Sequence, residues 1–231
     1  MINLLRVDAA PQRAVLILAH GAGAPMDSEF MEALAAALAG QGISTLRFEF
    51  PYMAQRRSGG SKRPPDPQAR LLDCWRSVLA SVQNSMAASN MQIPLLIGGK
   101  SMGGRMASLL ACDLPDSDIP VSGLCCFGYP FHPPGKAGLL SDRQQQTRTG
   151  HLPSLPIPML IVQGSRDPLG NRARISTAGW SPQIRLHWLE DGDHDFKPRK
   201  LSGYTQPDLL TEAAVATGEF VGLLEEGALK G

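Results

Sequence analysis

The 231-residue sequence predicts an α/β fold, in which helices cover both faces of an open, doubly wound, mostly parallel sheet of about six or seven strands. Short apolar runs of strand length alternate along the chain with longer segments whose apolar residues recur at helical spacing. One such run, Ala14–Ala19, is apolar at every position, as expected for a strand that is covered on both faces. The connections are long enough for parallel crossovers, and eight even strand–helix units, as in a closed barrel, do not fit.

The predicted elements follow one another in a regular order. The expected strands are residues 2–7 (an edge strand), 14–19, 43–50, 93–97, 121–127, 157–162 and 184–189. The expected helices are an Ala-rich helix that begins at the N-cap candidates Asp27 and Ser28 and ends at Gly40, and residues 68–88, 105–112, 171–179 and 207–226. Two segments rich in proline, residues 51–67 and 128–156, are predicted as loops.

Composition restricts the class of protein. Hydrophobic residues make up 43% of the chain and the formal net charge is +1, so we expect one domain over residues 1–231 without a general attraction to nucleic acid or membranes. The four cysteines form no C-x-x-C pair, which favours buried reduced thiols and a cytoplasmic location. The first apolar run is too short for a signal peptide or a membrane span. The oligomeric state is left open.

Residues 98–104, Gly-Gly-Lys-Ser-Met-Gly-Gly, lie between a predicted strand and a predicted helix. Gly99, Ser101 and Gly103 occupy the fixed positions of the G-x-S-x-G nucleophile elbow, whose serine sits on a tight, strained turn. The turn places the serine beside the N-terminus of the outgoing helix, where backbone N–H groups favour developing negative charge. Ser101 is therefore the candidate nucleophile.

The same residues allow two other interpretations. Gly99-Lys100-Ser101 also matches the end of a phosphate-binding P-loop, G-x-x-x-x-G-K-[ST]. That motif needs its first glycine at position 94, where Pro94 offers neither the conformational freedom nor the N–H of a phosphate cradle. The remaining alternative is an ordinary glycine-rich turn between a strand and a helix.

An elbow serine needs a base and an acid that orients it, and these follow later in the chain at the ends of further strands. Asp167 comes after the strand at 157–162, and His194 comes after the strand at Ile184–Leu189. Because the carboxyl ends of parallel strands meet at one edge of a sheet, we expect Ser101, His194 and Asp167 to converge there. A plain turn role for Asp167 is the competing interpretation.

Other histidines and acids near the same loops are weaker candidates. His132 and His151 lie in the long irregular segment, whereas His187 lies within a strand and predicts packing or surface exposure. The alternation Asp191, Asp193, Asp195 resembles a calcium loop, but a phenylalanine and a serine stand where that loop needs glycine and glutamate. We therefore expect no metal site.

Taken together, these segments resemble the α/β-hydrolase superfamily over nearly the whole chain. The similarity is to its small, nearly lid-less branch, which includes dienelactone-hydrolase-like proteins and the hydrolase-like domains of testis-expressed proteins and of a histone acetyltransferase complex subunit. The segments that carry the resemblance are His-Gly-Ala-Gly at 20–23, Gly-Lys-Ser-Met-Gly-Gly-Arg at 99–105, Gly-Ser-Arg-Asp at 164–167 and Asp-His-Asp-Phe at 193–196.

The resemblance implies an oxyanion hole formed by the backbone N–H groups of Met102 and Ala22, with His20 organising the loop. It implies a serine hydrolase that acts on a small ester, thioester or lactone and needs no cofactor. Lid domains in this superfamily are usually inserted after the strand that here ends at Phe127. Residues 128–156 are too few and too rich in proline for a multi-helix lid.

A basic segment, residues 56–63, follows a strand that should end at the active-site edge. Arg56 and Arg57 are therefore candidate substrate-binding residues for a carboxylate or phosphate, and Lys100, directly before the candidate nucleophile, is a further candidate. A solvated loop is the simpler interpretation, and no aromatic residue within the segment indicates base stacking. The alternative function is an interaction module that keeps the fold and binds a partner through this segment.

Overall fold

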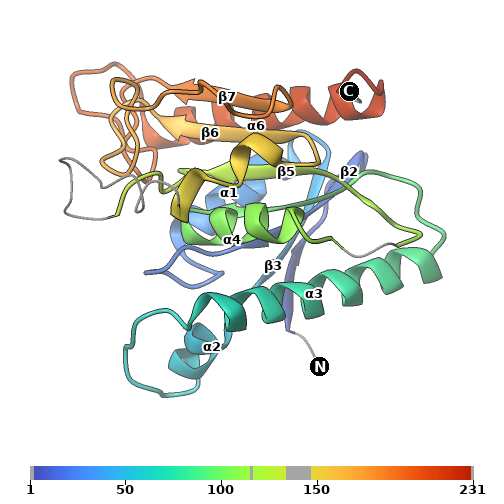
Figure 1. Ribbon diagram of the computed structural model, residues 1–231. Helices are drawn as coiled ribbons and strands as arrows, with labels where there is room; N and C mark the ends of the chain where they lie inside the picture. Colours follow the sequence, from blue (N-terminus) through green and yellow to red (C-terminus); the bar gives the residue numbers. More distant parts are fainter. Residues whose placement is uncertain (1–2, 115–116, 134–146, 230–231) are drawn as a thin grey trace.

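A seven-stranded sheet forms the centre of the computed structural model, which describes residues 3–114, 117–133 and 147–229 (Figure 1). The strands are β1 Leu4–Val7, β2 Ala14–Ala19, β3 Ile43–Phe48, β4 Leu95–Lys100, β5 Val121–Phe127, β6 Met159–Gly164 and β7 Ile184–Leu189. They lie in the order β1-β3-β2-β4-β5-β6-β7, and all neighbours are parallel except the antiparallel pair β1 and β3. The predicted open, mostly parallel sheet is confirmed.

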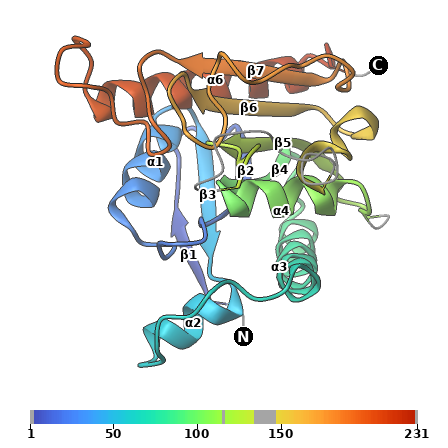
Figure 2. The same cartoon turned by 60° about the vertical axis from the view of Figure 1, so that its left-hand side comes forward.

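Helices cover both faces of this sheet, as predicted (Figures 1 and 2). They are α1 Glu29–Ala39, α2 Pro51–Arg57, α3 Gln68–Ala88, α4 Met102–Ala111, the short 3₁₀ helix η1 Leu152–Ser154 and α6 Gln206–Glu225. Side chains of β2 alternate between two cores because successive residues of a strand point to opposite faces. Leu16 and Leu18 belong to the core with α1 and α6, whereas Ile17 belongs to the core with α3 and α4.

Two predicted elements are wrong. Residues 51–67 do not form a loop throughout, because the segment begins with α2, where Pro51 has a fixed backbone angle suited to the first turn of a helix. Residues 171–179 form turns and no helix. The other helix boundaries lie within a few residues of prediction, and Thr205 and Asp208 form a capping box at the start of α6.

The direction in which successive strands are added to the sheet reverses at β2. The chain passes from β2 to β3 on one side and then crosses back to β4 on the other side of β2. Ala19 and Gly99, near the ends of β2 and β4, are paired in register, so the loops that follow them begin side by side. Ligands of open α/β sheets bind at such a point.

Three further expectations concern the chain as a whole. None of the helices in the described ranges has the length and apolar character needed to cross a bilayer. The four cysteines are unpaired, but Cys112 is exposed, so the expectation of burial is wrong for that residue. Part of the segment 128–156, on which the absence of a large lid depends, lies outside the described residues, and the single-domain organisation stays a prediction.

Candidate active site

Ser101 lies at the sharp turn between β4 and α4, with backbone angles φ 52° and ψ −117°. A positive φ is strained for a residue with a side chain, and such strain is typical of functional positions. The flanking glycines make the turn possible. A Cβ atom on Gly99 would lie 2.6 Å from the Ala19 carbonyl oxygen, and one on Gly103 would lie 2.5 Å from the His20 carbonyl oxygen. Only glycine permits this close approach of the elbow to the end of β2.

The structure brings Ser101, His194 and Asp167 into one hydrogen-bonded chain. The distance from Ser101 Oγ to His194 Nε2 is 2.9 Å, and the distance from His194 Nδ1 to Asp167 Oδ2 is 2.7 Å. Asp167 is fully buried, whereas the His194 side chain is 25% exposed. With a carboxylate as its partner, Nδ1 carries the proton, which leaves Nε2 free to accept the proton of the serine hydroxyl.

Asp167 is held by more than the histidine. Its Oδ2 also accepts a hydrogen bond of 2.8 Å from the Gln163 side-chain amide, and its Oδ1 accepts one of 2.7 Å from the Leu169 N–H. The buried Gln163, at the end of β6, further accepts from the Tyr129 N–H. Sequence reasoning missed Gln163. Its signal was a glutamine near the end of an otherwise apolar strand, four residues before Asp167.

The neighbouring acids shape the loop that carries His194. Asp191 has a positive φ of 56° and accepts hydrogen bonds from Arg199. Asp193 Oδ1 accepts the N–H groups of Asp195 and Lys197, which fixes the turn around the histidine. These carboxylates therefore hold the backbone, and it is Asp167 whose oxygen meets His194 Nδ1.

The two expected oxyanion donors, the N–H groups of Ala22 and Met102, come shortly after the paired ends of β2 and β4. Met102 is the first residue of α4, and its N–H has no acceptor within the helix. Among the described residues, neither its N–H nor that of Ala22 donates a hydrogen bond. Both groups are therefore available to a bound oxyanion.

His20 organises the loop that contains Ala22. Its Nε2 accepts the Phe50 N–H at 3.1 Å, so its proton lies on Nδ1, which donates to the Gly21 carbonyl at 2.6 Å. Burial lowers the pKa of this histidine, so the neutral ring is favoured. Tyr52 adds a hydrogen bond from its hydroxyl to the Ala22 carbonyl oxygen. The loop is thus fixed from both sides by buried side chains.

The three candidate substrate-binding cations have different surroundings. Arg57, on α2, forms ion pairs with Asp27 and Glu49, both at 2.7 Å. Arg56 is exposed and has no ion pair with any described residue. Lys100 is buried, and its ammonium group meets the His194 carbonyl and Asp195. Of the three, only Arg56 has a cation that no carboxylate in the described part of the chain already holds.

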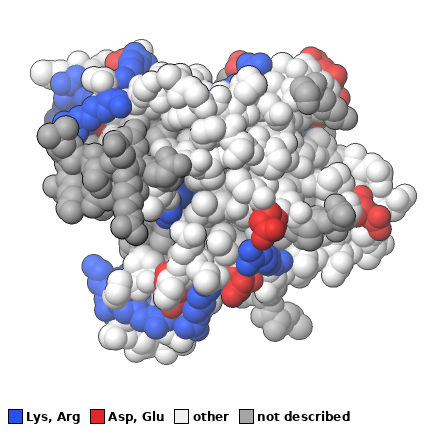
Figure 3. Space-filling view, viewed as in Figure 1, with Lys and Arg blue, Asp and Glu red and all other residues white. Residues whose placement is uncertain are grey.

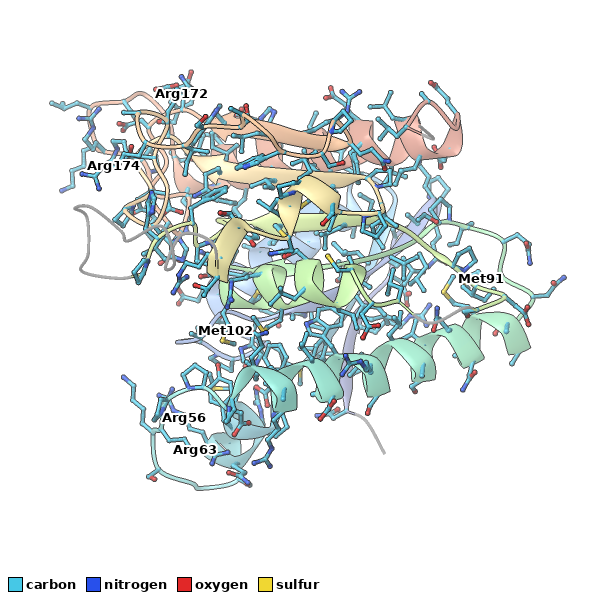
Figure 4. The ribbon with its side chains drawn as sticks, in the orientation of Figure 1. Arg56, Arg63, Met91, Met102, Arg172 and Arg174 are labelled. Carbon is cyan, nitrogen blue, oxygen red and sulfur yellow. The ribbon has the colours of Figure 1, made fainter. Side chains whose placement is uncertain are left out.

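Arginine and lysine side chains gather over α2 and the loop that follows it (Figure 3). In Figure 4, Arg56 and Arg63 lie on one side of Met102, while Arg172 and Arg174 lie beyond it on the other. Arg63 forms an ion pair with Asp66 at 3.2 Å. The basic segment 56–63 is thus partly neutralised and partly open to solvent.

The remaining histidines form other contacts. His151 Nε2 lies 2.8 Å from Ser108 Oγ, on the side of α4 that packs against the segment before β6. His187 Nε2 lies 2.9 Å from a carboxylate oxygen of Glu212 on α6. In the described part of the chain, His194 is the histidine that contacts Ser101.

Comparison with known proteins agrees with this architecture. Residues 12–222 match the model of a family described as an alpha/beta hydrolase domain, and the chain belongs to that family. The predicted resemblance is confirmed, and the P-loop interpretation of the elbow is wrong.

Several solved structures share the fold. A dienelactone hydrolase from Anabaena variabilis has 18% identity and a TM-score of 0.62, over 93% of this chain and 88% of that one. Est1E from Butyrivibrio proteoclasticus, solved with ferulic acid, has 18% identity and a TM-score of 0.63, over 98% and 96% of the two chains. An α/β serine hydrolase without lid from Xanthomonas campestris has 18% identity and a TM-score of 0.56, over 98% and 88%. Family and fold together support a hydrolase.

Proposed function

We propose that the protein is a serine hydrolase that cleaves a small ester, thioester or lactone through an acyl-enzyme. The observation that supports this most strongly is the continuous hydrogen-bonded chain from Ser101 Oγ through His194 to the buried Asp167. The strained elbow and the two open N–H groups complete the set of parts that acyl transfer requires.

In the proposed reaction, His194 Nε2 takes the hydroxyl proton as Ser101 Oγ attacks the substrate carbonyl carbon. The N–H groups of Met102 and Ala22 bind the oxyanion of the tetrahedral intermediate, and each such donor contributes about 3–4 kcal/mol to transition-state stabilisation. His194 then gives its proton to the leaving alkoxide or thiolate, which departs as an alcohol or thiol or, in a lactone, becomes the hydroxyl group of the opened ring, and an acyl-serine ester remains. Water, activated by the same nitrogen, hydrolyses that ester and restores the serine.

Labelling with a fluorophosphonate tests this proposal directly. The reagent phosphonylates activated serines, so we expect one adduct per chain, on the proteolytic peptide that contains Ser101. Heat-unfolded protein is the control, because it contains the same serine without its base. An adduct on another serine of the folded protein, or equal labelling before and after unfolding, would contradict the proposal.

We further propose that the substrate is compact. The support is the short segment 128–156, together with the likeness in fold to a hydrolase described as lid-less. Without a lid domain, few apolar side chains are available to cover a long acyl chain. In a series of p-nitrophenyl esters, we expect kcat/KM to be higher for acetate or butyrate than for laurate. A preference for laurate would contradict a small, open pocket.

Arg56 is proposed to favour anionic substrates by attracting them to the active-site edge. Arg57 serves as the matched control, because its ion pairs with Asp27 and Glu49 already hold its guanidinium group. We expect Arg56→Ala to lower kcat/KM for a carboxylate-bearing ester at low salt but not for a neutral ester. Arg57→Ala should instead lower the free energy of unfolding by about 1 kcal/mol. If Arg56→Ala had the same kcat/KM as wild type for both substrates, at low and at high salt, the cation would have no such role.

A second candidate function is the binding of an acidic partner by the segment 56–63. The exposed basic surface over α2 favours it (Figure 3). Fluorophosphonate labelling separates the two functions, since a pure binding module has no need of an activated serine. An unlabelled protein that binds acidic peptides in a salt-dependent manner would favour the binding function.

A further inference from the structure

Lys100, the residue directly before the candidate nucleophile, has a buried charge. Its side chain is only 7% exposed, and its ammonium nitrogen lies 3.3 Å from an Asp195 carboxylate oxygen. The same nitrogen donates a hydrogen bond to the backbone carbonyl of His194. The rings of Phe30 and Phe196 lie 5.1 and 5.9 Å from it, within the range of cation–π attraction. The ammonium group is therefore bound to the loop that carries the candidate base.

Placing a lysine here is costly. Burial lowers the pKa of Lys100, because desolvation disfavours its charged form, while Asp195, then Asp167 and Asp193, act in the opposite direction. A methionine of similar length would fill the same space beside two phenylalanines without that cost. The folded protein thus carries a charge that packing alone does not need.

The contact between Lys100 and His194 is tightly enclosed. A Cβ atom on Gly128 would lie 3.1 Å from both the Lys100 ammonium and the His194 carbonyl oxygen, so a larger residue would crowd the contact. The loop around His194 has positive φ angles at Asp191 and Phe196. Such a loop keeps its conformation only where surrounding contacts hold it.

We propose that Lys100 is a positioning residue: its ammonium group holds the backbone of His194 against the elbow, so that the imidazole stays within hydrogen-bond distance of Ser101. Because Lys100 and Ser101 are adjacent in the chain, the contact between the Lys100 ammonium and the His194 carbonyl ties the backbone of the candidate base to that of the candidate nucleophile. The base is then fixed at two points, its ring by Asp167 and its backbone by Lys100. This inference rests on the proposed hydrolase function.

The central variant is Lys100→Met, which keeps the length of the side chain and removes both charge and donor. We expect kcat to fall about 100-fold, the loss typical of a catalytic group displaced by about 1 Å, with KM nearly unchanged. Lys197→Met is the matched control: Lys197 is an exposed lysine of the same loop, and its loss should change neither kcat nor KM.

Lys100→Gln tests the donor, because its amide can still donate to the His194 carbonyl without a charge. We expect this variant to recover most of kcat. If Lys100→Met stays within about twofold of wild-type kcat, the proposal is overturned. If Lys100→Met does not fold, Lys100→Leu decides, because leucine also lacks a donor: wild-type kcat in that variant would equally overturn the proposal.

Proton NMR keeps this inference separate from the proposed function. The His194 Nδ1 proton shared with Asp167 should give a downfield resonance in wild type that is lost or broadened in Lys100→Met. If fluorophosphonate labels wild type on Ser101 but the resonance is unchanged in Lys100→Met, only the positioning role is overturned. Unlabelled wild type would overturn the hydrolase function, and a resonance that still depends on Lys100 would preserve the positioning role.

Discussion

Ser101→Ala is expected to lower kcat by about 10⁶-fold, close to the loss found when the nucleophile of a complete triad is removed. Alanine lacks the oxygen that attacks the carbonyl in the proposed reaction, whereas the N–H groups of Met102 and Ala22 remain in place. The fold should persist, because alanine meets the same backbone strain at φ 52° as serine does. Steady-state hydrolysis of p-nitrophenyl butyrate and the melting temperature measure the two effects separately.

Ser108 provides a matched control for this variant. It too is a serine whose hydroxyl contacts a histidine, with Ser108 Oγ 2.8 Å from His151 Nε2. It is fully buried on α4, so solvent and substrate have no access to it. Ser108→Ala should therefore keep kcat near wild type. If Ser108→Ala lost activity while Ser101→Ala kept it, Ser101 would not be the nucleophile.

Asp167→Asn is expected to lower kcat by about 10⁴-fold, by analogy with the corresponding change in a serine protease triad. Three donors converge on this carboxylate: the His194 ring, the Gln163 amide and the Leu169 N–H. Asparagine would replace one of the two accepting oxygens by an NH₂ group, which is a fourth donor among groups that all donate. The imidazole would then place its proton on Nε2, where it can no longer accept the serine proton.

The control for Asp167→Asn is Asp193→Asn on the loop of His194. Asp193 uses one oxygen to accept the N–H groups of Asp195 and Lys197, and an asparagine carbonyl can accept both. This variant should keep kcat within about tenfold of wild type. If Asp193→Asn lost activity while Asp167→Asn kept it, the orienting acid would be Asp193.

The parts of the site that sequence could predict are those fixed by local rules. The elbow depends on close contacts of Gly99 and Gly103, so its pattern appears in seven consecutive residues. Asp167 and His194 lie in the loops that follow β6 and β7, and parallel strands bring their carboxyl ends to one edge. Their role as catalytic residues stays a prediction, but their convergence follows from position in the chain alone.

The rest depends on contacts between residues far apart in the chain. The sequence predicts Lys100 as a substrate-binding residue, because it directly precedes the candidate nucleophile. Its buried position is set by Asp195 and the backbone of His194, more than 90 residues later. Likewise, α2 begins in a proline-rich segment whose composition predicts a loop. Tyr52 and Met53 bury their side chains, and Asp66 accepts the Tyr52 N–H, which supports this short helix by tertiary contacts.

The order of elements along the chain also sets when the proposed site can be completed during synthesis. From β4 onward, each strand joins the outer edge left by the one before it, in the order β4, β5, β6 and β7. The ribosome adds about 5–20 residues per second, beginning at the N-terminus. A nascent chain that ends after β4 therefore carries Ser101 without Asp167, and one that ends with β6 still lacks His194. Under the proposed function, Ser101 can be activated only after the segment that follows β7 has left the ribosome.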